Sequence, residues 1–456
     1  MLYEALKPVI GIALHWYYRS LSIANLERIP REGPVFLAAN HPNSLTDAMV
    51  VGWTSPRRVR FTAKATLFAN PLSAGFLRAV GVVPLRRSAD EKSSTPDGAP
   101  APTVPDAARN AASFAAVADA LAEQSCIVVF PEGKTHDEPY MAPVRTGLAR
   151  MALMARDERG VQGIRIVPIG LLFERKAEPR TRILLQVGEP IDVDGLGSGP
   201  STVATLTELI EQRLRAMTLN FESRADAERI QLLSETLVAL MEPETSVDEG
   251  APPLARTLAL VRRIERAQQT LRARNDASTS ARIDLFEQRL RAWRERLANA
   301  RIDVHDVSID LSTSLGARFV VREMAIATVM VPISLWGRVT HIVPIRLARY
   351  LALRNVTALD EPPMRTFIVG LVLVLASYVV LTTLVGLAFG PWWALAFFAS
   401  LIPSASSDLR YGDRMRRVRA RARAFRLFRK DPSLQASLLA DADWLRVEAG
   451  ALESIK

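Results

Sequence analysis

Val35-Phe36-Leu37-Ala38 leads into Ala39-Asn40-His41-Pro42-Asn43-Ser44-Leu45-Thr46-Asp47, and Ala48-Met49-Val50-Val51 follows. The first four apolar residues predict a buried strand, and the last four predict the first turns of a helix. A histidine and a carboxylate therefore stand on a tight strand-to-helix connection. Loops that a rigid scaffold holds are where catalytic groups concentrate, so this stretch predicts both the fold and the site.

His41 and Asp47 have the chemistry of a base and the acid that orients it. A neutral imidazole can take a proton from a hydroxyl near neutral pH. A carboxylate on the other ring nitrogen fixes the tautomer and stabilises the imidazolium that forms. Two structural alternatives stay open: Ser44-x-x-Asp47 also fits a capping box, in which Asp47 only caps the helix, and His41 is then an ordinary hydrogen-bonded loop residue.

The amino-acid composition of the chain indicates what kind of partner it binds. The 456 residues suffice for two or three domains. The net charge is +10, from 58 Lys+Arg against 48 Asp+Glu, and nearly all the basic residues are arginine. Such a balance indicates a polyanionic partner: nucleic acid, anionic lipid or a phosphorylated substrate. The one cysteine, Cys126, lies in an apolar run and is expected in the core rather than as a nucleophile.

Short apolar runs alternate with helical patterns up to about residue 195. The predicted strands are 35–39, 58–63, 80–85, 126–130, 164–172 and 181–187, and the predicted helices are 45–53, 71–79, 108–123 and 145–156. This alternation predicts an α/β domain over residues 24–220, with a largely parallel sheet flanked by helices. Residues 88–106, rich in Pro, Ser, Asp and Ala, predict a mobile loop that is either a lid or an insert without a role.

Helical patterns flank this domain. Residues 1–23 predict an N-terminal helix, and its Trp16, Tyr17 and Tyr18 suit either a membrane interface or packing on the domain. Residues 204–241 and 254–301 predict an antiparallel helical pair joined by a linker at 242–253, within a helical region over 221–320.

Residues 321–408 are predicted to be membrane-associated. No charged residue lies between Arg365 and Asp408. As a helix, 367–388 would extend about 33 Å, enough for a hydrocarbon core of roughly 30 Å. Phe389-Gly390-Pro391 breaks the pattern, and 392–407 follows. Arginines on both sides predict a hairpin, fully spanning or re-entrant, whose ends stay on the cytoplasmic face of the inner membrane. A buried helical core is the alternative.

Two neighbouring segments complete this region. Residues 324–336 predict a shorter interfacial helix. Residues 409–456 predict a basic cytoplasmic helix or tail, and the arginine run within 410–430 fits nucleic acid or anionic lipid. Its place beside the hairpin favours anionic membrane lipids, with no nucleic acid as partner.

Three further stretches accompany the first one in order along the chain. Gly81-Val82-Val83-Pro84-Leu85-Arg86-Arg87 ends a strand with two guanidiniums. Phe130-Pro131-Glu132-Gly133-Lys134-Thr135-His136-Asp137 follows another strand, and Ile166-Val167-Pro168-Ile169-Gly170 lies within a third. Each has a structural explanation by itself, but their order and spacing after His41 are much more specific.

These blocks resemble the glycerolipid acyltransferase family, with its His…Asp box, Gly-x-x-Pro-x-x-Arg block, Phe-Pro-Glu-Gly block and Val-Pro-Ile block. The resemblance covers about residues 20–220. The longer run from Phe130 to Gly147 is similar to the branch of the fungal glycerol-3-phosphate/dihydroxyacetone-phosphate acyltransferases and their bacterial relatives.

The chain departs from the common family pattern at two positions. The usual box has four residues between His and Asp, whereas five separate His41 from Asp47 and Thr46 occupies the usual aspartate position. The fungal-type branch also has the longer box, so the aspartate role is carried to Asp47. Thr135 occupies the place of the arginine that is usual in lysophosphatidate acyltransferases, which leaves the acceptor open.

The resemblance implies a membrane-bound O-acyltransferase of phospholipid biosynthesis. His41 would act as general base and Asp47 would hold it. Arg87, with Arg86 or Lys64, would bind the phosphate of the acceptor.

The same resemblance implies roles in binding for three further positions. Glu132 and Gly133 would position the acceptor, Glu132 by hydrogen bonding one of its hydroxyls. Thr135 belongs to the same block, and Pro168 would border the acyl-donor site.

The expected donor is an acyl-CoA or acyl-carrier-protein thioester, and no cofactor is expected. No metal site is expected either, because the five histidines, His15, His41, His136, His305 and His341, lack ligand spacing. The alternative function is a lipid-binding or scaffolding membrane protein that keeps the fold without activity. The sequence leaves open the acceptor, the acyl-chain length, the donor carrier and the oligomeric state.

Overall fold

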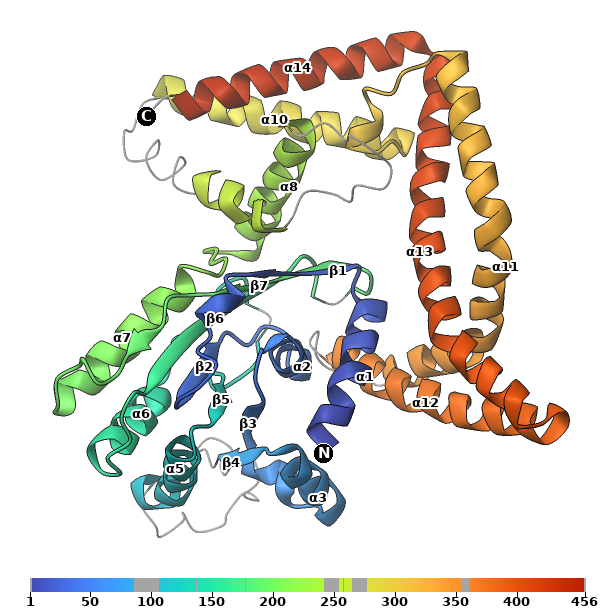
Figure 1. Cartoon of the computed structure of the whole chain (residues 1–456). Helices are drawn as coiled ribbons and strands as arrows, with labels where there is room; N and C mark the ends of the chain where they lie inside the picture. The colour runs from blue at the N-terminus through green and yellow to red at the C-terminus, as the bar shows by residue number, and fades with distance from the viewer. Residues whose placement is uncertain are drawn as a thin grey trace. The chain divides into compact units, whose positions relative to one another are not determined.

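The computed structural model in Figure 1 describes residues 2–85, 106–136, 138–176, 178–241, 254–256, 258–264, 277–354 and 361–454. The chain forms two compact units. The first comprises Met1–Glu222 with Ala352–Ile368, and the second comprises Ser223–Leu351 with Val369–Lys456.

The first unit contains the sheet and the helices that cover it. Its strands are β1 (Ser20–Ala24), β2 (Val35–Ala39), β3 (Val59–Lys64), β4 (Val83–Leu85), β5 (Cys126–Val129), β6 (Arg165–Phe173), β7 (Arg182–Val187) and β8 (Ile191–Asp192). Its helices are α1 (Leu2–Tyr17), α2 (Leu45–Thr54), α3 (Pro71–Val80), α5 (Asp106–Ala122), α6 (Gly147–Asp157) and α7 (Pro200–Arg215), with 3-10 turns η1 (Leu26–Arg28) and η2 (Ala65–Phe68).

The sheet is largely parallel, as predicted. Its strand order is β1-β7-β6-β2-β5-β3-β4, with β8 pairing β6. β6 runs parallel to β2 but antiparallel to β7 and β8, and the other pairs are parallel. All six predicted strands form, but the one predicted over 80–85 is limited to Val83–Leu85, because α3 extends to Val80. Strand β1 is not among the predicted strands because Ser20 and Ser22 interrupt its apolar pattern. It is a strand through its parallel pairing with β7.

Both faces of the sheet are covered, which explains why the central strands read as unbroken apolar runs. Side chains of a strand alternate between faces. Val35, Leu37 and Ala39 join one core cluster with residues of α1 and α2, whereas Phe36 and Ala38 join another with residues of α5, α6 and α7. Figure 1 shows α1 and α2 on one side of the sheet and α5, α6 and α7 on the other. All of β2 is therefore buried, and its end is a firm base for the loop that follows.

Pro168 lies inside β6, where a proline cannot donate to the ladder. Ile166 pairs with β8 and Ile169 pairs with β7, so Pro168 falls where the neighbouring strand changes. Its carbonyl still accepts a hydrogen bond from the Gly188 N–H at 2.8 Å. The position therefore accommodates proline without leaving an unpaired backbone group.

Helix α1 packs on the first unit through polar and apolar contacts to α2. The Tyr3 hydroxyl donates to the Gly52 carbonyl at 3.2 Å, and Lys7 donates to the Ser55 carbonyl at 2.8 Å. The Cβ of any residue larger than glycine at position 11 would meet the indole of Trp53. Packing on the domain was one of the two alternatives for this helix; a membrane-interface role stays a prediction.

The second unit is helical. It contains α8 (Arg224–Met241), α10 (Ala277–Ala300), the turn η3 (Val304–Asp306), α11 (Thr313–Ala352), most of α12 (Glu361–Phe389), α13 (Pro391–Lys430) and α14 (Pro432–Ser454). The predicted continuous helix over 204–241 is instead two helices, α7 and α8, with non-helical residues between them. The described part of α10 packs on α14 from the C-terminal region, and Trp293 donates to the Leu438 carbonyl at 3.0 Å. The predicted linker at 242–253 lies outside the described residues.

Helices α11, α12 and α13 pack together in the second unit. His341 of α11 and the Tyr378 hydroxyl of α12 are 2.7 Å apart, and Gly337 lets α11 approach the Ser404 backbone of α13. The predicted break at 389–391 is confirmed, since α12 ends at Phe389, α13 begins at Pro391, and Gly390 has a φ of 96°.

Among the described helices, two are long and apolar enough to cross a membrane by length and composition, α11 and residues Arg365–Phe389 of α12. The predicted short helix 324–336 is the middle of α11, which has 40 residues. The predicted second arm, 392–407, is the first half of α13, which continues through the arginine run.

Candidate active site

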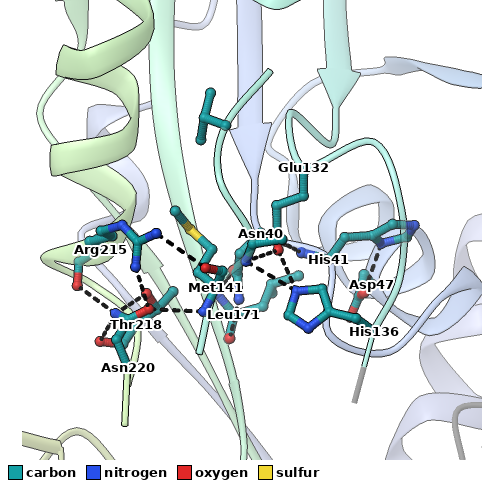
Figure 2. Close-up of polar contacts among 12 residues, drawn as sticks. Asn40, His41, Asp47, Glu132, His136, Met141, Leu171, Arg215, Thr218 and Asn220 are labelled. Carbon is teal, nitrogen blue, oxygen red and sulfur yellow. Dashed lines mark hydrogen bonds and ion pairs between the residues drawn. The ribbon is translucent and has the colours of Figure 1, made fainter. Parts of the chain in front are cut away.

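The His41 imidazole and the Asp47 carboxylate contact each other, as their places on the connection between β2 and α2 predict (Figure 2). His41 Nδ1 lies 2.9 Å from Asp47 Oδ2. The His41 side chain is 18% exposed and that of Asp47 is 0% exposed. Because an ionised carboxylate only accepts, Nδ1 carries the proton, and the lone pair of Nε2 is left to accept another.

Asp47 contacts the imidazole, and the capping box that the sequence left open does not form, since the N-cap Ser44 makes no side-chain capping hydrogen bond. It stands in the first turn of α2, where the helix dipole favours a negative charge. Its Oδ2 also accepts the Asn43 backbone N–H at 2.7 Å, so it organises the entry into the helix as well as the imidazole. Burial raises the pKa of Asp47, and the hydrogen bonds from His41 and Asn43 oppose that rise by stabilising the ionised form.

The loop after β5 supports His41 from a second direction. The Phe130 ring stacks on the His41 ring with centroids 4.0 Å apart and an interplanar angle of 17°. Glu132 Oε1 accepts the His41 backbone N–H at 2.7 Å. Gly133 adopts a φ of +74°, which favours glycine. Because β5 is parallel to β2 and paired with it, the two loops leave the same edge of the sheet.

Asn40 is a site residue that the sequence prediction missed. Its side-chain amide donates to the Leu171 carbonyl at 3.0 Å and accepts the Leu171 N–H at 2.6 Å. The ladder between β2 and β6 ends at Ala39 and Ile169, so the Asn40 amide takes the place of the next peptide group. An asparagine directly after a buried strand was the available signal.

His136 is a second missed residue. Its Nε2 lies 2.7 Å from Glu132 Oε2, and Figure 2 shows Glu132 between His136 and the His41 backbone. In the sequence, His136 stands within the Phe-Pro-Glu-Gly block and is one of five histidines without ligand spacing, which gave no sign of its contact with Glu132. Within the described ranges, no group of three or more His, Cys, Asp or Glu residues could hold a metal ion.

The remaining predicted residues lie as follows. Lys64 is exposed at the end of β3, beside Leu85 at the end of β4. Arg86 and Arg87 follow Leu85 in the sequence and lie outside the described residues, as does the predicted loop up to residue 105. Thr135 is half-buried and Pro168 is buried in β6. These predicted contacts with substrate stay predictions.

The order of the strands brings the blocks to one edge. Strands β2, β5, β3 and β4 are neighbours in that order and all run parallel. Their carboxyl ends therefore meet at one edge, where ligands bind in open α/β sheets. With about 4.8 Å between strands, the end of β4 lies roughly 14 Å across the sheet from the end of β2.

Comparison with known proteins bears on the same residues. Residues 20–172 match the family model described as Acyltransferase. Glycerol-3-phosphate O-acyltransferase 2 of Saccharomyces cerevisiae is 36% identical over 117 residues, which cover 24% of this chain and 16% of that protein. Glycerol-3-phosphate O-acyltransferase 1 of the same yeast is 36% identical over 73 residues, which cover 16% and 10%. This chain thus spans a minor part of either relative.

Among solved structures, the 1-acyl-sn-glycerophosphate acyltransferase PlsC from Thermotoga maritima is similar, with a TM-score of 0.35 and 18% identity. The similarity covers 47% of this chain and 77% of that chain.

Proposed function

Because residues 20–172 form a domain of the Acyltransferase family, we propose that this chain is a membrane-bound O-acyltransferase of phospholipid biosynthesis. It transfers a fatty acyl group from an acyl thioester, carried by coenzyme A or acyl carrier protein, to a hydroxyl of a glycerol-phosphate-type acceptor. The observation that carries the proposal is the contact of 2.9 Å between the His41 ring and the fully buried Asp47, with the other ring nitrogen left to act as base.

The mechanism needs one general base. The acceptor hydroxyl attacks the thioester carbonyl as His41 Nε2 takes its proton. The tetrahedral intermediate then expels the thiolate, which receives the proton from the imidazolium, so that an ester and a thiol are formed. Asp47 keeps Nδ1 protonated and stabilises the imidazolium. General-base assistance of this kind contributes about 10²–10⁴ in rate.

The acceptor phosphate is assigned to the cationic residues that follow β3 and β4. Lys64 stands at the end of β3, and Arg87, with Arg86, follows β4 in the sequence. Guanidinium groups hold phosphate by paired, charge-assisted hydrogen bonds. Gly133 and Thr135 border the acceptor, and Pro168 with its apolar neighbours borders the acyl donor.

The second unit is proposed to hold the enzyme in the membrane. The apolar hairpin of α12 and the first half of α13 enters the bilayer from the cytoplasmic face of the inner membrane. Along α13 about 27 Å separate residues 391 and 409, close to the thickness of a hydrocarbon core. The exposed Arg410 and Arg416 then lie near the level of anionic headgroups.

The test is an acceptor panel. The full-length protein is incubated in detergent or vesicles with acyl-CoA, or with acyl carrier protein thioester, and thiol release is followed. Glycerol 3-phosphate, dihydroxyacetone phosphate and lysophosphatidate are added in turn. Release that depends on at least one acceptor, and that falls about 10²–10⁴-fold in His41→Ala, is the expected result.

No release with any acceptor would reject the enzymatic function. If such a protein still binds anionic vesicles, the lipid-binding or scaffolding alternative replaces it.

A further inference from the structure

Glu132 is a buried carboxylate whose two oxygens are both engaged by the protein. It is 2% exposed. Oε1 accepts the His41 N–H at 2.7 Å, and Oε2 accepts the Ala142 N–H at 2.8 Å and lies 2.7 Å from His136 Nε2. The side chain thus joins the loop after β2 to two points of the loop after β5, as Figure 2 shows.

His136 completes the set of donors that this carboxylate needs. A buried charge is tolerated only where hydrogen bonds replace its hydration. With Glu132 ionised, a ring nitrogen 2.7 Å from its oxygen carries a proton, because two acceptors at that distance would repel each other. The Ala142 N–H, which lies 2.8 Å from Glu132 Oε2 and 3.1 Å from His136 Nε2, then donates to the carboxylate. His136 Nδ1 is buried without a partner in the described part of the chain, so a proton there would remain unpaired. The neutral Nε2–H tautomer of His136 fits this geometry.

The segment that carries these groups is anchored from the other side as well. The Met141 N–H donates to Asn220 Oδ1 at 2.9 Å, and Arg215 donates to the Met141 carbonyl at 3.2 Å (Figure 2). Residue 142, which binds Glu132, is the next residue along. Helix α7 and the chain directly after it therefore hold Met141, and Glu132 holds the neighbouring Ala142 on the side of the loop that faces His41.

These hydrogen bonds help to determine the position of the His41 ring. Asp47 fixes the ring at Nδ1, but the ring can only point correctly if its backbone is also fixed. The Glu132 bond supplies that second point, and Phe130 on the same loop supplies the stacking surface. A displacement of about 1 Å at a catalytic group can cost about 10²-fold in rate.

We infer that Glu132 and His136 are positioning residues that act through His41: His136 holds the Glu132 carboxylate in place, and Glu132 holds the His41 backbone. The inference rests on the proposed role of His41 as general base. It assigns Glu132 a task different from hydrogen bonding the acceptor hydroxyl. The two tasks separate in kinetics, since loss of positioning lowers kcat and loss of an acceptor contact raises the KM of the acceptor.

The experiment compares Glu132→Gln, His136→Ala and His136→Gln with the wild type in the full-length protein, using thiol release with the best acceptor. We expect kcat to fall about 10–100-fold in Glu132→Gln and His136→Ala while the KM of the acceptor stays within about twofold. His136→Gln, whose amide N–H can occupy the place of Nε2–H, should recover most of the lost kcat. His305→Ala, at a histidine of the second unit, is the matched control and should leave both constants unchanged.

Three outcomes would overturn the inference: wild-type kcat in His136→Ala, a raised acceptor KM with unchanged kcat in Glu132→Gln, or a glutamine at position 136 no better than alanine. If His136→Ala does not fold, His136→Asn replaces it, because the shorter amide cannot reach the place of Nε2; equal kcat in the Asn and Gln variants then counts against the inference. A wild-type protein that is inactive with every acceptor would instead reject the proposed function. The failure of the inference and the failure of the proposed function are therefore distinguishable.

Discussion

Replacement of Asp47 by asparagine tests the most specific contact of the site. Asp47 Oδ2 accepts two N–H groups, one from His41 at 2.9 Å and one from Asn43 at 2.7 Å, in a fully buried position. An asparagine with its oxygen at that place keeps both hydrogen bonds but loses the charge. The opposite orientation presents an NH₂ group to two donors and forces the wrong His41 tautomer.

The magnitude follows from the imidazolium that forms during proton transfer. Two charges about 4 Å apart attract each other by about 4 kcal/mol at an effective dielectric constant of about 20. That corresponds to about 10³ in rate, and the asparagine dipole restores part of it. We therefore expect Asp47→Asn to lower kcat by about 10²–10³-fold, with little change in the KM of the acceptor.

The assay is thiol release from acyl-CoA at saturating acceptor, with thermal unfolding as a check that the variant folds. Asp119→Asn is the matched control, because Asp119 lies on α5 with an exposed side chain that pairs with Arg159; its kcat should equal that of the wild type. A folded Asp47→Asn protein with kcat within about threefold of the wild type would refute the assignment of Asp47 as the orienting acid.

The same variant gives a stability prediction with a sign. Burial raises the pKa of Asp47, so the folded protein holds this proton more tightly than the unfolded chain. That contribution to stability is fully present below the unfolded pKa and is lost as the pH rises through the folded pKa. Asparagine does not titrate. The free energy of unfolding of Asp47→Asn minus that of the wild type should therefore increase with pH over this window, as denaturation at several pH values would show.

Three further predictions concern residues away from the proposed chemistry. Burial raises the pKa of Cys126 to about 12, so at pH 8 only about one thiol in 10⁴ is ionised. Alkylation by iodoacetamide should therefore be very slow in the folded protein and fast in denaturant. Rapid labelling of the folded protein would contradict the burial of Cys126. Burial disfavours the Glu174 carboxylate, but its hydrogen bonds with Arg182 and the charge of that residue outweigh burial and lower the pKa of Glu174. That stabilisation is present above the unfolded pKa and is lost as the pH falls through the folded pKa, so Glu174→Gln should destabilise the protein more at pH 7 than at pH 3, and a constant difference would argue against the pair. Trp293 is 1% exposed and donates to Leu438, so Trp293→Ala should reduce the free energy of unfolding by about 3–5 kcal/mol; a change below about 1 kcal/mol in chemical denaturation would mean that this core is not formed.

Much of the α/β unit could be predicted because its signals are local. A central parallel strand must be apolar on both faces, so β2, β5 and most of β6 are visible as runs of apolar residues. Gly390 and Pro391 likewise mark the break between α12 and α13 by their backbone restrictions alone. Strand β1 could not be found this way, because its two serines become tolerable only through its pairing with β7.

One helix partner in the second unit also escaped prediction. The predicted pair of 204–241 and 254–301 has a counterpart in α8 and α10, which share a core cluster and are joined by Arg229 and Glu287 at 3.0 Å. The apolar stripe of α10 was visible, with Leu290, Trp293 and Leu297 at helical spacing. An apolar stripe indicates that a helix face is covered but does not identify the covering element. In the structure α14 covers it, from more than a hundred residues further along the chain.

By itself the sequence determined the kinds of groups present and their order: an imidazole and an acid on one turn, a Phe-Pro-Glu-Gly turn after a later strand, and a long uncharged tract. Only the tertiary structure decided how these groups act on each other. Whether Glu132 meets solvent or the His41 backbone depends on the pairing of β2 with β5, which joins residues about ninety positions apart. The physical reason is that hydrogen bonds of a buried carboxylate are satisfied by whichever donors the fold brings within 3 Å, and the distance along the chain does not specify them.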